Sequence, residues 1–335
     1  MGEYDALPGL SQKLSTVKEP VVVGGCGHGF GHNLLGTGSI GATLGIKKAL
    51  ENGELKGTIR YYGCPAEETF SGKVFMIREG VFDDLDAALV WHPEYRNFLR
   101  KTPGLAMNSV IFKFKGISAH AAAPHLGRSA LDGVELMNIG VNYLREHVEN
   151  TLRIHYIITT NGGGEPNVVP DEAEAWYYSR VPERRQVKET LKRIIKIAEG
   201  AAMMTDTALE VEFVSGSYSI LENSVLEKVV FQSLMEVPIE EYTEEELEFA
   251  KVLNDKNQEQ AQANRKKYHL PADTIINRGV MPEPNMVGFG STDVGDVVYI
   301  VPGISFRTKC ANIGAVGHSW QFTACSGHSI GHKGV

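Results

Sequence analysis

Hydrophobic and polar residues follow two different periods in the first part of the chain. Apolar residues recur at helical spacing over 37–53 and about 71–80, whereas GTIRYYG (57–63) and LDAALVWHP (85–93) have the length and composition of strands. The first pair predicts helices, the earlier one ending at Asn52, and the second pair predicts strands of a buried sheet. Strands and helices in this order indicate parallel βαβ units. We therefore expect an α/β domain with a parallel-rich sheet flanked by helices.

The pattern changes at about residue 108. SVIFKFKG alternates apolar residues with lysine, which is typical of a strand with one exposed face. The elements expected after it are an amphipathic helix at 129–149, strands near 153–160 and 172–181, a helix at 186–204 and a strand at 208–214. This β-α-β-β-α-β order predicts a small inserted ferredoxin-like α+β domain.

Two further segments lie between this domain and the C-terminal part of the chain. Residues 236–268 are highly charged, and we expect them to form a solvated helical excursion. MVGFGSTDVGDVVYIVPG (286–303) then predicts a glycine-rich loop that returns the chain to the first domain through a strand.

Length and composition narrow the class of protein. A chain of 335 residues suits one large α/β domain or two domains. The net charge of -8, without a long Lys/Arg cluster, argues against a nucleic-acid partner. We expect no membrane segment and no signal peptide, because no apolar run has the required length or position. Four sparse cysteines favour a reducing, cytoplasmic location over a disulfide framework.

The stretch GGCGHGFGHNLLG (24–36) concentrates candidate metal ligands in a glycine-rich turn. It contains Cys26, His28 and His32, and Cys and His are common ligands of transition metals. The glycines let the backbone turn tightly and approach another group closely. A metal site and a strand-to-helix turn with merely solvated histidines are both consistent with this stretch.

Other polar side chains are expected at the ends of the predicted strands. In open α/β sheets, chemistry gathers beyond the carboxyl ends of the strands. Of the adjacent glutamates in CPAEE, one can bind a metal ion while the other takes a proton from water and passes it to a leaving amine. The alternative for these glutamates is an exposed acidic pair. The alternative for the histidine before Pro93 is a buried core histidine. The residues expected at this edge are Asp5, His28, His32, Glu67, Glu68 and His92.

The C-terminal part adds three histidines. His328 and His332 are four residues apart and would share a helix face, either as metal ligands or as solvated side chains. His318, in the loop GHSW, is free to reach back to the sheet edge.

Several motifs together resemble a known family. They are GEYDALPGLSQ, GHNLLGTGS, GCPAEET, WHP, SAHAAAPHLGRSALDG, GGGEPNVVPDEAEAWYYSR, STDVGDV and GHSWQFTACSGHSIGHKG. The chain resembles the metal-dependent aminoacylases, carboxypeptidases and auxin-conjugate amidohydrolases over essentially its whole length. The last two motifs are similar to the branch of aminobenzoyl-glutamate hydrolase B subunits. The resemblance implies a zinc-exopeptidase-like catalytic domain (1–107 and 218–335) and a lid and dimerisation domain at 108–217.

The resemblance also implies roles for residues of the catalytic domain. Glu67 corresponds to the general base, and Asp5 to an aspartate that orients a metal ligand. Glu3 stands where sister families have a histidine ligand. The resemblance implies two divalent ions per site, Mn or Zn, held by His32, Glu68, His92 and His318, with His328 as a rival to His318.

In the lid domain, His120 resembles a histidine that reaches a neighbouring subunit's site and stabilises the tetrahedral oxyanion. Asn167 and Arg180 resemble the groups that hold the substrate carboxylate, a role for which the planar fork of arginine is suited. The implied substrate is an N-acyl amino acid of the aminobenzoyl-glutamate type, which would belong to folate catabolism. The implied partners are a second copy of the chain, through the lid domain, and a related A subunit. For this contact we expect an edge at SVIFKFKG and an apolar face on the helix at 129–149, formed by Leu131, Val134, Leu136 and Val141.

Two departures from the family favour an alternative, a catalytically silent binding or regulatory subunit. Relatives have a cysteine ligand at the position of Phe30, whose ring cannot bind a metal, and Cys26 would need a different loop path to replace it. Relatives also carry a helix and strand before GEYDALPG and a helix after GHKG, so we expect a chain shortened at both ends.

Overall fold

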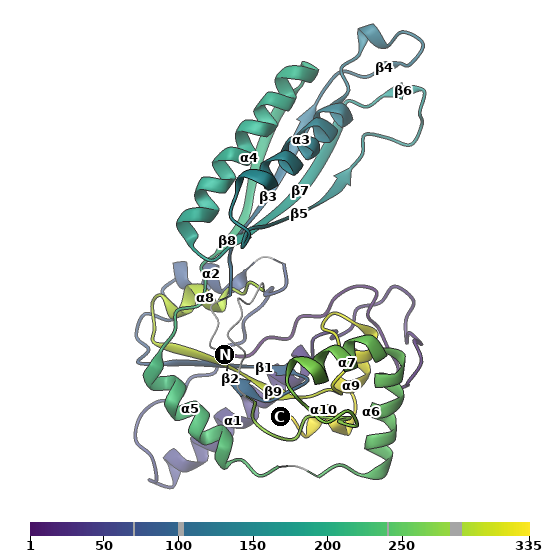
Figure 1. Cartoon of the computed structure of the whole chain (residues 1–335). Coiled ribbons are helices and arrows are strands. Elements are labelled where there is room, and N and C mark those ends of the chain that lie inside the picture. The colour runs from purple at the N-terminus through teal and green to yellow at the C-terminus, as the bar shows by residue number, and fades with distance from the viewer. Residues whose placement is uncertain (70, 100–103, 240, 282–289) are drawn as a thin grey trace. The chain divides into compact units, whose positions relative to one another are not determined.

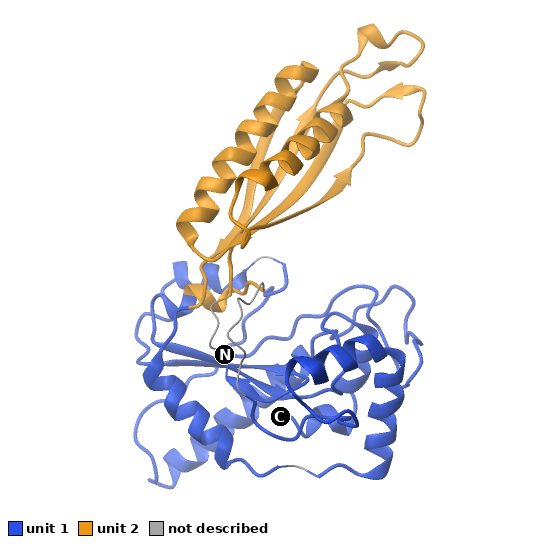
Figure 2. Cartoon of the chain, in the orientation of Figure 1, with its two compact units in different colours: residues 1–102, 221–287, 297–335 blue, residues 103–220, 288–296 orange. Residues whose placement is uncertain are grey.

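The computed structural model describes residues 1–69, 71–99, 104–239, 241–281 and 290–335. The chain forms two compact units, each with contacts mainly to itself (Figure 2). Unit 1 comprises Met1–Thr102, Leu221–Val287 and Val297–Val335, and unit 2 comprises Pro103–Ile220 and Gly288–Asp296. The first part of the expected glycine-rich loop, 286–289, lies outside the described residues.

Unit 1 contains a three-stranded sheet in the order β1-β9-β2 (Figure 1). β1 (Ala88–Glu94) runs parallel to β9 (Gly303–Lys309), and the short β2 (Phe98–Leu99) pairs antiparallel with β9. The helices of unit 1 are α1 (His32–Glu51), α2 (Gly72–Arg78), α5 (Ser224–Glu236), α6 (Glu244–Lys256), α7 (Gln258–Lys267), α9 (Trp320–Ser326) and α10 (Ser329–His332), and the residues of α8 (Val294–Val298) are divided between the two units.

The strand expected at 57–63 is wrong. This segment is mostly exposed, and its ladder pairing with the rest of the described chain is limited to a parallel bridge between Gly2 and Gly63. Gly2 N–H donates to the Tyr62 carbonyl, and Cys64 N–H donates to the Gly2 carbonyl, each at 2.8 Å. Strand-like composition does not make a strand unless a neighbour offers a continuous ladder of backbone partners.

The N-terminal half of α1 fixes one wall of the candidate site. Leu34 and Leu35 are buried and pack with Trp91 of β1. Gly31, which precedes the helix, has φ 74°, a left-handed conformation that glycine adopts without strain. A side chain at Gly31 would also collide with Pro93, since a Cβ there would lie 2.9 Å from the Pro93 Cβ. His32 therefore begins the helix directly against the end of β1.

The charged stretch at 236–268 is helical, as expected, but it is not simply a solvated excursion. α6 and α7 bury Ala250, Leu253 and Ala261, and Leu253 packs with Phe322 of α9. Most charged residues of these helices are exposed, but Glu246 of α6 is buried together with these apolar residues.

Unit 2 is a four-stranded antiparallel sheet in the order β5-β7-β3-β8, covered by two helices. Its core includes Phe112 and Phe114 of β3, Val134 and Val141 of α3, and Ile194 of α4. The order β-α-β-β-α-β and this strand order confirm the ferredoxin-like prediction. Its elements are β3 (Ala106–Lys115), β4 (Ala119–His120), η1 (Pro124–Leu126), α3 (Ala130–Leu144), η2 (Arg145–His147), β5 (Arg153–Thr160), β6 (Val168–Val169), β7 (Glu172–Val181), α4 (Arg184–Thr205) and β8 (Ala208–Ser217).

SVIFKFKG does not provide the expected edge for pairing. It belongs to β3, which lies between β7 and β8, so the edges of this sheet are β5 and β8.

The apolar face expected on the helix at 129–149 is also used internally. Val134 and Val141 are fully buried in the core of unit 2, and Leu131 and Leu136 pack against that core. The periodicity of a strand shows which face is buried, but not which strands flank it.

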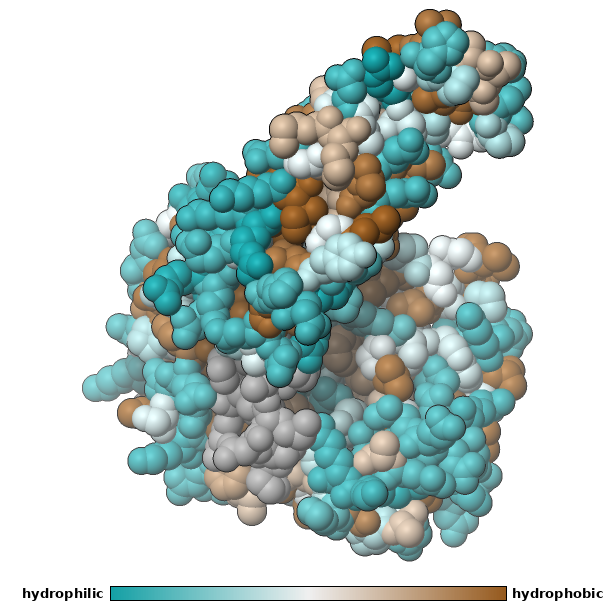
Figure 3. All heavy atoms as spheres, turned by 45° about the horizontal axis from the view of Figure 1, so that its top comes forward, coloured by the Kyte–Doolittle hydropathy of each residue, from teal (hydrophilic) through white to brown (hydrophobic). Residues whose placement is uncertain are grey.

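The surface drawn in Figure 3 is mostly hydrophilic, with hydrophobic side chains scattered among polar ones. Among the described residues, no helix has both the length and the apolar composition that crossing a bilayer requires.

Candidate metal centre

Imidazole and carboxylate groups from separate segments of unit 1 meet around His32. His32 is 1% exposed and is the first residue of α1. Its Nε2 lies 3.2 Å from Nε2 of His92. Glu3 Oε2 and Glu68 Oε1 each lie 3.9 Å from the same His32 nitrogen. Ligand atoms of His32, Glu3 and Glu67 all lie within 4.8 Å of one another.

Asp5 connects two members of this cluster. Its Oδ2 lies 3.7 Å from Nδ1 of His32 and accepts a hydrogen bond from the Glu67 N–H at 3.3 Å. Burial alone would raise the pKa of Asp5, but His32, the Glu67 N–H and the charge of Lys73 together outweigh it, and the pKa falls below the ordinary value. Asp5 is therefore held as a carboxylate on the far side of the His32 ring from Nε2.

The neighbouring carboxylates also act on His32 itself. Burial alone would lower the pKa of this imidazole. Asp5 and Glu3, together with the two glutamates after Ala66, more than compensate, so the pKa of His32 is raised. A site that stabilises a positive charge on a buried imidazole also offers a favourable potential to a cation.

Glu3 is buried and paired with a lysine. Its Oε1 lies 2.5 Å from Nζ of Lys73 in α2, and the two side chains are 2% and 0% exposed. Glu3 stands at a ligand position of sister families but was not among the expected ligands, and Lys73 was not expected at the site. The position of Glu3 two residues before Asp5 was a usable signal. The sequence around Lys73, at the start of α2, offers no comparable signal.

His318 joins the cluster from the C-terminal part of the chain. Its Nε2 lies 3.1 Å from Glu68 Oε1, and its side chain is 49% exposed. The His318 N–H donates to the Gly29 carbonyl at 2.8 Å, which fixes this loop against the glycine-rich turn. His318 adopts φ 59°, an uncommon left-handed conformation for a residue with a Cβ.

His328 lies outside this cluster. Its ring stacks on Phe249 with centroids 4.2 Å apart, and its Nδ1 accepts a hydrogen bond from the Ile330 N–H at 3.3 Å. His328 therefore caps α10, and His332 ends that helix. Between the two rivals, the structure brings His318, and not His328, to the glutamates.

The expectation that strand ends deliver these groups is wrong in its details. Only His92 lies near the end of a strand that the structure describes, β1. Asp5, Glu67 and Glu68 lie in loops, and His32 begins a helix. His28 contributes to the loop rather than to the cluster, since its Nδ1 lies 2.8 Å from the Asp5 carbonyl oxygen.

The cluster fits a divalent transition metal. Donor atoms bound to one ion at about 2.1 Å lie roughly 3–4 Å apart, which matches the separations around His32 Nε2. Mixed imidazole and carboxylate donors suit Zn, Mn, Co or Ni. His32 Nδ1 is buried and has no hydrogen-bond partner among the described residues, although Asp5 lies beside it.

Phe30 stands between two of the histidines. Its ring packs edge-on against His92, with centroids 4.6 Å apart, and against His318, with centroids 5.2 Å apart. Cys26 is exposed and does not belong to the group of potential ligands found among the described residues. The structure therefore does not place the Cys26 thiol where it could replace the cysteine that relatives have at the position of Phe30.

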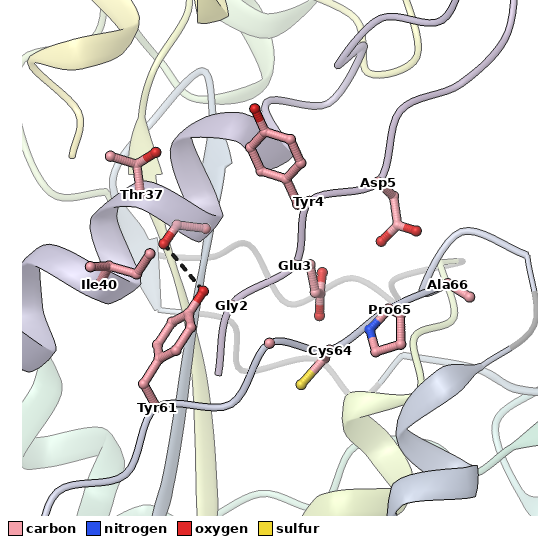
Figure 4. A pocket seen from close by; sticks show the side chains of 12 residues that line it. Gly2, Glu3, Tyr4, Asp5, Thr37, Ile40, Tyr61, Cys64, Pro65 and Ala66 are labelled. Carbon is pink, nitrogen blue, oxygen red and sulfur yellow. Dashed lines mark hydrogen bonds between the residues drawn. The ribbon is translucent and has the colours of Figure 1, made fainter.

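A cavity of about 520 Å³ is lined in part by residues 2–5, which include Glu3 and Asp5. Figure 4 shows Glu3 and Asp5 on one wall, with the rings of Tyr4 and Tyr61 along other parts of the lining. The Tyr61 hydroxyl donates a long hydrogen bond of 3.5 Å to the Gly36 carbonyl, which links this wall to α1.

The three expected substrate-contacting residues lie in unit 2. His120 is exposed at the end of β4, and its Nδ1 accepts a hydrogen bond from the Ala122 N–H at 2.9 Å. Asn167 is close to it, because the Ala121 N–H donates to the Asn167 carbonyl at 2.8 Å. Arg180 lies near the C-terminal end of β7, one residue before its last residue, Val181. Burial lowers the pKa of Arg180, and its Nε has no hydrogen-bond partner among the described residues.

Comparison with known proteins identifies the family. Residues 105–206 match the model of a peptidase dimerisation domain of the M20 class. The chain is 44% identical to the B subunit of p-aminobenzoyl-glutamate hydrolase from Escherichia coli (strain K12), over 100% of this chain and 73% of that protein. The chain belongs to the M20 family of metal-dependent hydrolases.

Two other M20-type comparisons agree with this assignment. The Xaa-Arg dipeptidase of Mus musculus is 31% identical over 97% of the chain, which spans 63% of that protein. A crystal structure of a dinuclear metal-binding peptidase of the M20 family from Bacillus subtilis has the same fold. It superposes with a TM-score of 0.51 at 16% identity, over 97% of this chain and 79% of that one. The family thus accounts for both the α/β unit and the ferredoxin-like unit.

Proposed function

We propose that this M20 protein hydrolyses the amide of an N-acyl amino acid of the aminobenzoyl-glutamate type. The observation that carries the proposal is the cluster itself, in which His32 and His92 face each other at 3.2 Å beside two adjacent glutamates. The E. coli relative, named as a hydrolase of p-aminobenzoyl-glutamate, supports the choice of substrate.

The proposed ligands are His32, Glu68, His92 and His318, and two divalent ions per site, Mn or Zn, suit them. The B. subtilis structure, described as dinuclear, supports the number of ions. Bound there, divalent ions supply a water of lowered pKa and a Lewis acid for the amide carbonyl. Glu3 is an additional candidate ligand because it shares the buried pocket with His32.

Glu67 is the proposed general base and then general acid. It takes a proton from the attacking water and passes it to the amine nitrogen that leaves. Its backbone N–H is fixed by Asp5, whose same oxygen lies 3.7 Å from His32. Asp5 thereby sets the relative positions of the base and a ligand.

Unit 2 is proposed to provide the lid and the dimer contact, over 108–217, between catalytic parts 1–107 and 218–335. His120 would stabilise the oxyanion in the partner's site, and Asn167 and Arg180 would hold the substrate carboxylate. The match to a dimerisation domain supports self-association. A relative from Haemophilus influenzae is named as a homologue of the A subunit of the same hydrolase, which supports a related A subunit as the second proposed partner. A cytoplasmic role in folate catabolism completes the proposal.

The proposal is tested with the purified chain, loaded with Mn²⁺ or Zn²⁺ and supplied with p-aminobenzoyl-glutamate. Release of p-aminobenzoate is expected from the wild type. Glu67→Gln is expected to remove turnover while metal content stays unchanged, whereas Glu79→Gln, on an exposed residue of the same region, leaves turnover intact. A metal-loaded wild type without activity on any N-acyl amino acid would instead favour a catalytically silent role.

A further inference from the structure

The donors of the metal centre fall into two groups of unequal strength. Around His32 Nε2, a second imidazole lies at 3.2 Å and two carboxylates lie at 3.9 Å. The side chains of His32 and Glu3 are each 2% exposed, so water competes little at this position. Around His318 Nε2, the structure places Glu68 at 3.1 Å, and the imidazole is half exposed.

The two groups share Glu68. Its Oε1 is 3.9 Å from His32 Nε2 and 3.1 Å from His318 Nε2. A carboxylate in this place can serve both positions, but an ion that already uses it leaves the His318 position with fewer protein donors. Affinity rises with the number and pre-organisation of donors, so the two positions start unequal.

Phe30 adds no donor to either position, and this lack matters more at the His318 position, which has fewer donors. The Phe30 ring contacts the imidazoles of both His92 and His318. The ring is also closely confined. A Cβ added to Gly317 would lie 2.8 Å from the Phe30 Cζ, and Phe322 packs on the ring edge-on with centroids 5.4 Å apart. The side chain therefore cannot move far toward Gly317 to admit a replacement ligand.

We propose that Phe30 makes metal loading stepwise: one divalent ion binds tightly at His32 and His92, and a second binds weakly and reversibly at His318 and Glu68. This inference rests on the proposed function and adds a regulatory consequence to it. The fully loaded state exists only where free metal is abundant, so Phe30 makes the enzyme respond to metal concentration.

The test is calorimetric titration of the metal-free chain with Mn²⁺ and with Zn²⁺. The wild type is expected to show two binding events whose dissociation constants differ by about 100-fold. His318→Ala should abolish the second event and leave the first within about threefold, because its imidazole belongs only to the weaker position. Two events of equal affinity in the wild type, or loss of the first event in His318→Ala, would overturn the inference while leaving the proposed function intact. Absence of any binding would overturn both.

Substitution of Phe30 separates the missing donor from the bulk of the ring. Phe30→Cys adds a thiolate and should tighten the second event by at least about tenfold, with a thiolate-to-metal absorption band appearing when Co²⁺ is the probe. Phe30→Leu removes the ring without adding a donor and should leave the second event weak. Phe75→Cys, on a half-exposed phenylalanine of α2, controls for a thiol elsewhere. Circular dichroism and thermal melting establish that each variant is folded. A Phe30→Cys variant that is folded and binds the second ion no more tightly than the wild type would contradict the role of Phe30.

Discussion

Lys73 Nζ lies 2.5 Å from Glu3 Oε1, with both side chains almost completely buried beside the candidate metal centre. The pair brings a fixed positive charge to within one side chain of His32, since the other oxygen of Glu3 lies 3.9 Å from His32 Nε2. Lys73 therefore offsets part of the negative charge that gathers there before any metal binds. It also lets a carboxylate remain ionised in a place from which water is excluded.

Replacing Lys73 by methionine should destabilise the metal-free protein strongly. The change leaves the Glu3 carboxylate buried without the ammonium group, and removal of one partner from a buried ion pair costs about 3–5 kcal/mol. Urea unfolding followed by circular dichroism, in the presence of a chelator, measures the loss. The double variant Lys73→Met with Glu3→Gln should recover most of it, because the uncompensated charge is gone.

The matched control is Lys47→Met, which breaks an exposed pair with Glu51 at 3.7 Å on α1. Solvent screens that pair, so little change is expected. Equal unfolding midpoints for the Lys73 and Lys47 variants would show that the Glu3–Lys73 pair contributes nothing to stability.

Asp5→Asn should weaken metal binding without unfolding the protein. The substitution keeps the shape of the side chain but removes the charge beside His32 Nδ1 and weakens the acceptor for the Glu67 N–H. Groups that orient a metal-binding imidazole typically contribute about 10–100-fold in affinity. Competition with a chromophoric chelator measures the change, and Asp86→Asn, in the loop before β1, is the control. An affinity equal to that of the wild type would mean that Asp5 does not support His32.

Glu246 predicts a stability change in acid that is separate from the metal centre. Burial would raise its pKa, but Lys333 at 2.6 Å, Ser329 at 2.5 Å and the Thr243 N–H at 2.8 Å bring it down to about 2. Because the pKa is lower in the folded than in the unfolded state, the carboxylate stabilises the fold fully above pH 4.5. That contribution is lost as the pH falls from 4.5 toward 2.

Glu246→Gln should therefore cost about 2–3 kcal/mol at pH 7 and progressively less below pH 4.5. Urea unfolding of the variant and of the wild type, across roughly pH 2.5 to about 7, would show the two stabilities converging in acid. Glu248→Gln, on the exposed face of the same helix, should show no such convergence. A constant difference between Glu246→Gln and wild type over the whole range would contradict the assigned pKa.

The order of the main strands and helices of the ferredoxin-like unit could be predicted from the sequence, although the helix expected at 129–149 ends at Leu144. Strands expected at 153–160 and 172–181 are β5 and β7, because alternating residues pack on one helical layer and local patterning is sufficient there. The position of SVIFKFKG within the sheet could not be predicted, since strand order depends on contacts between distant segments. The strand expected at 57–63 did not form for a related reason: its composition suits a strand, but among the residues that the structure describes it has one bridged partner, Gly2.

Candidate site residues could be chosen from short-range motifs, but their contacts across the fold could not. Glu67, Glu68 and His92 could be chosen from their places beside proline and predicted strands. The ion pair between Glu3 and Lys73 joins residues far apart in the sequence, and nothing in either local pattern indicates the other. The contacts of the Phe30 ring with two histidines likewise arise only when the loops meet.

Dimerisation offers a test of how the site is completed. The open edges of unit 2 are β5 and β8, and Ile157 and Ile158 of β5 are exposed. Pairing of two such edges about a twofold axis would bury unpaired backbone groups of both copies. The expected edge contact through β3 is thereby replaced by a proposed contact through β5 or β8. The proposal that two copies of the chain share a site is unchanged.

If His120 serves the partner's site, two inactive chains should complement each other. His120→Ala lacks the oxyanion group, and Glu67→Gln lacks the base, so each homodimer is expected to be inactive. In a mixed dimer, one site lacks both groups, while the other combines the intact Glu67 of one copy with the intact His120 of its partner. Random exchange makes half of the dimers mixed and should restore roughly a quarter of the wild-type sites. Exchange between dimers is verified with differently tagged chains, and activity is measured before and after mixing. Confirmed exchange with no recovery of activity would show that His120 acts on its own chain, and an active His120→Ala homodimer would show that it has no role in turnover.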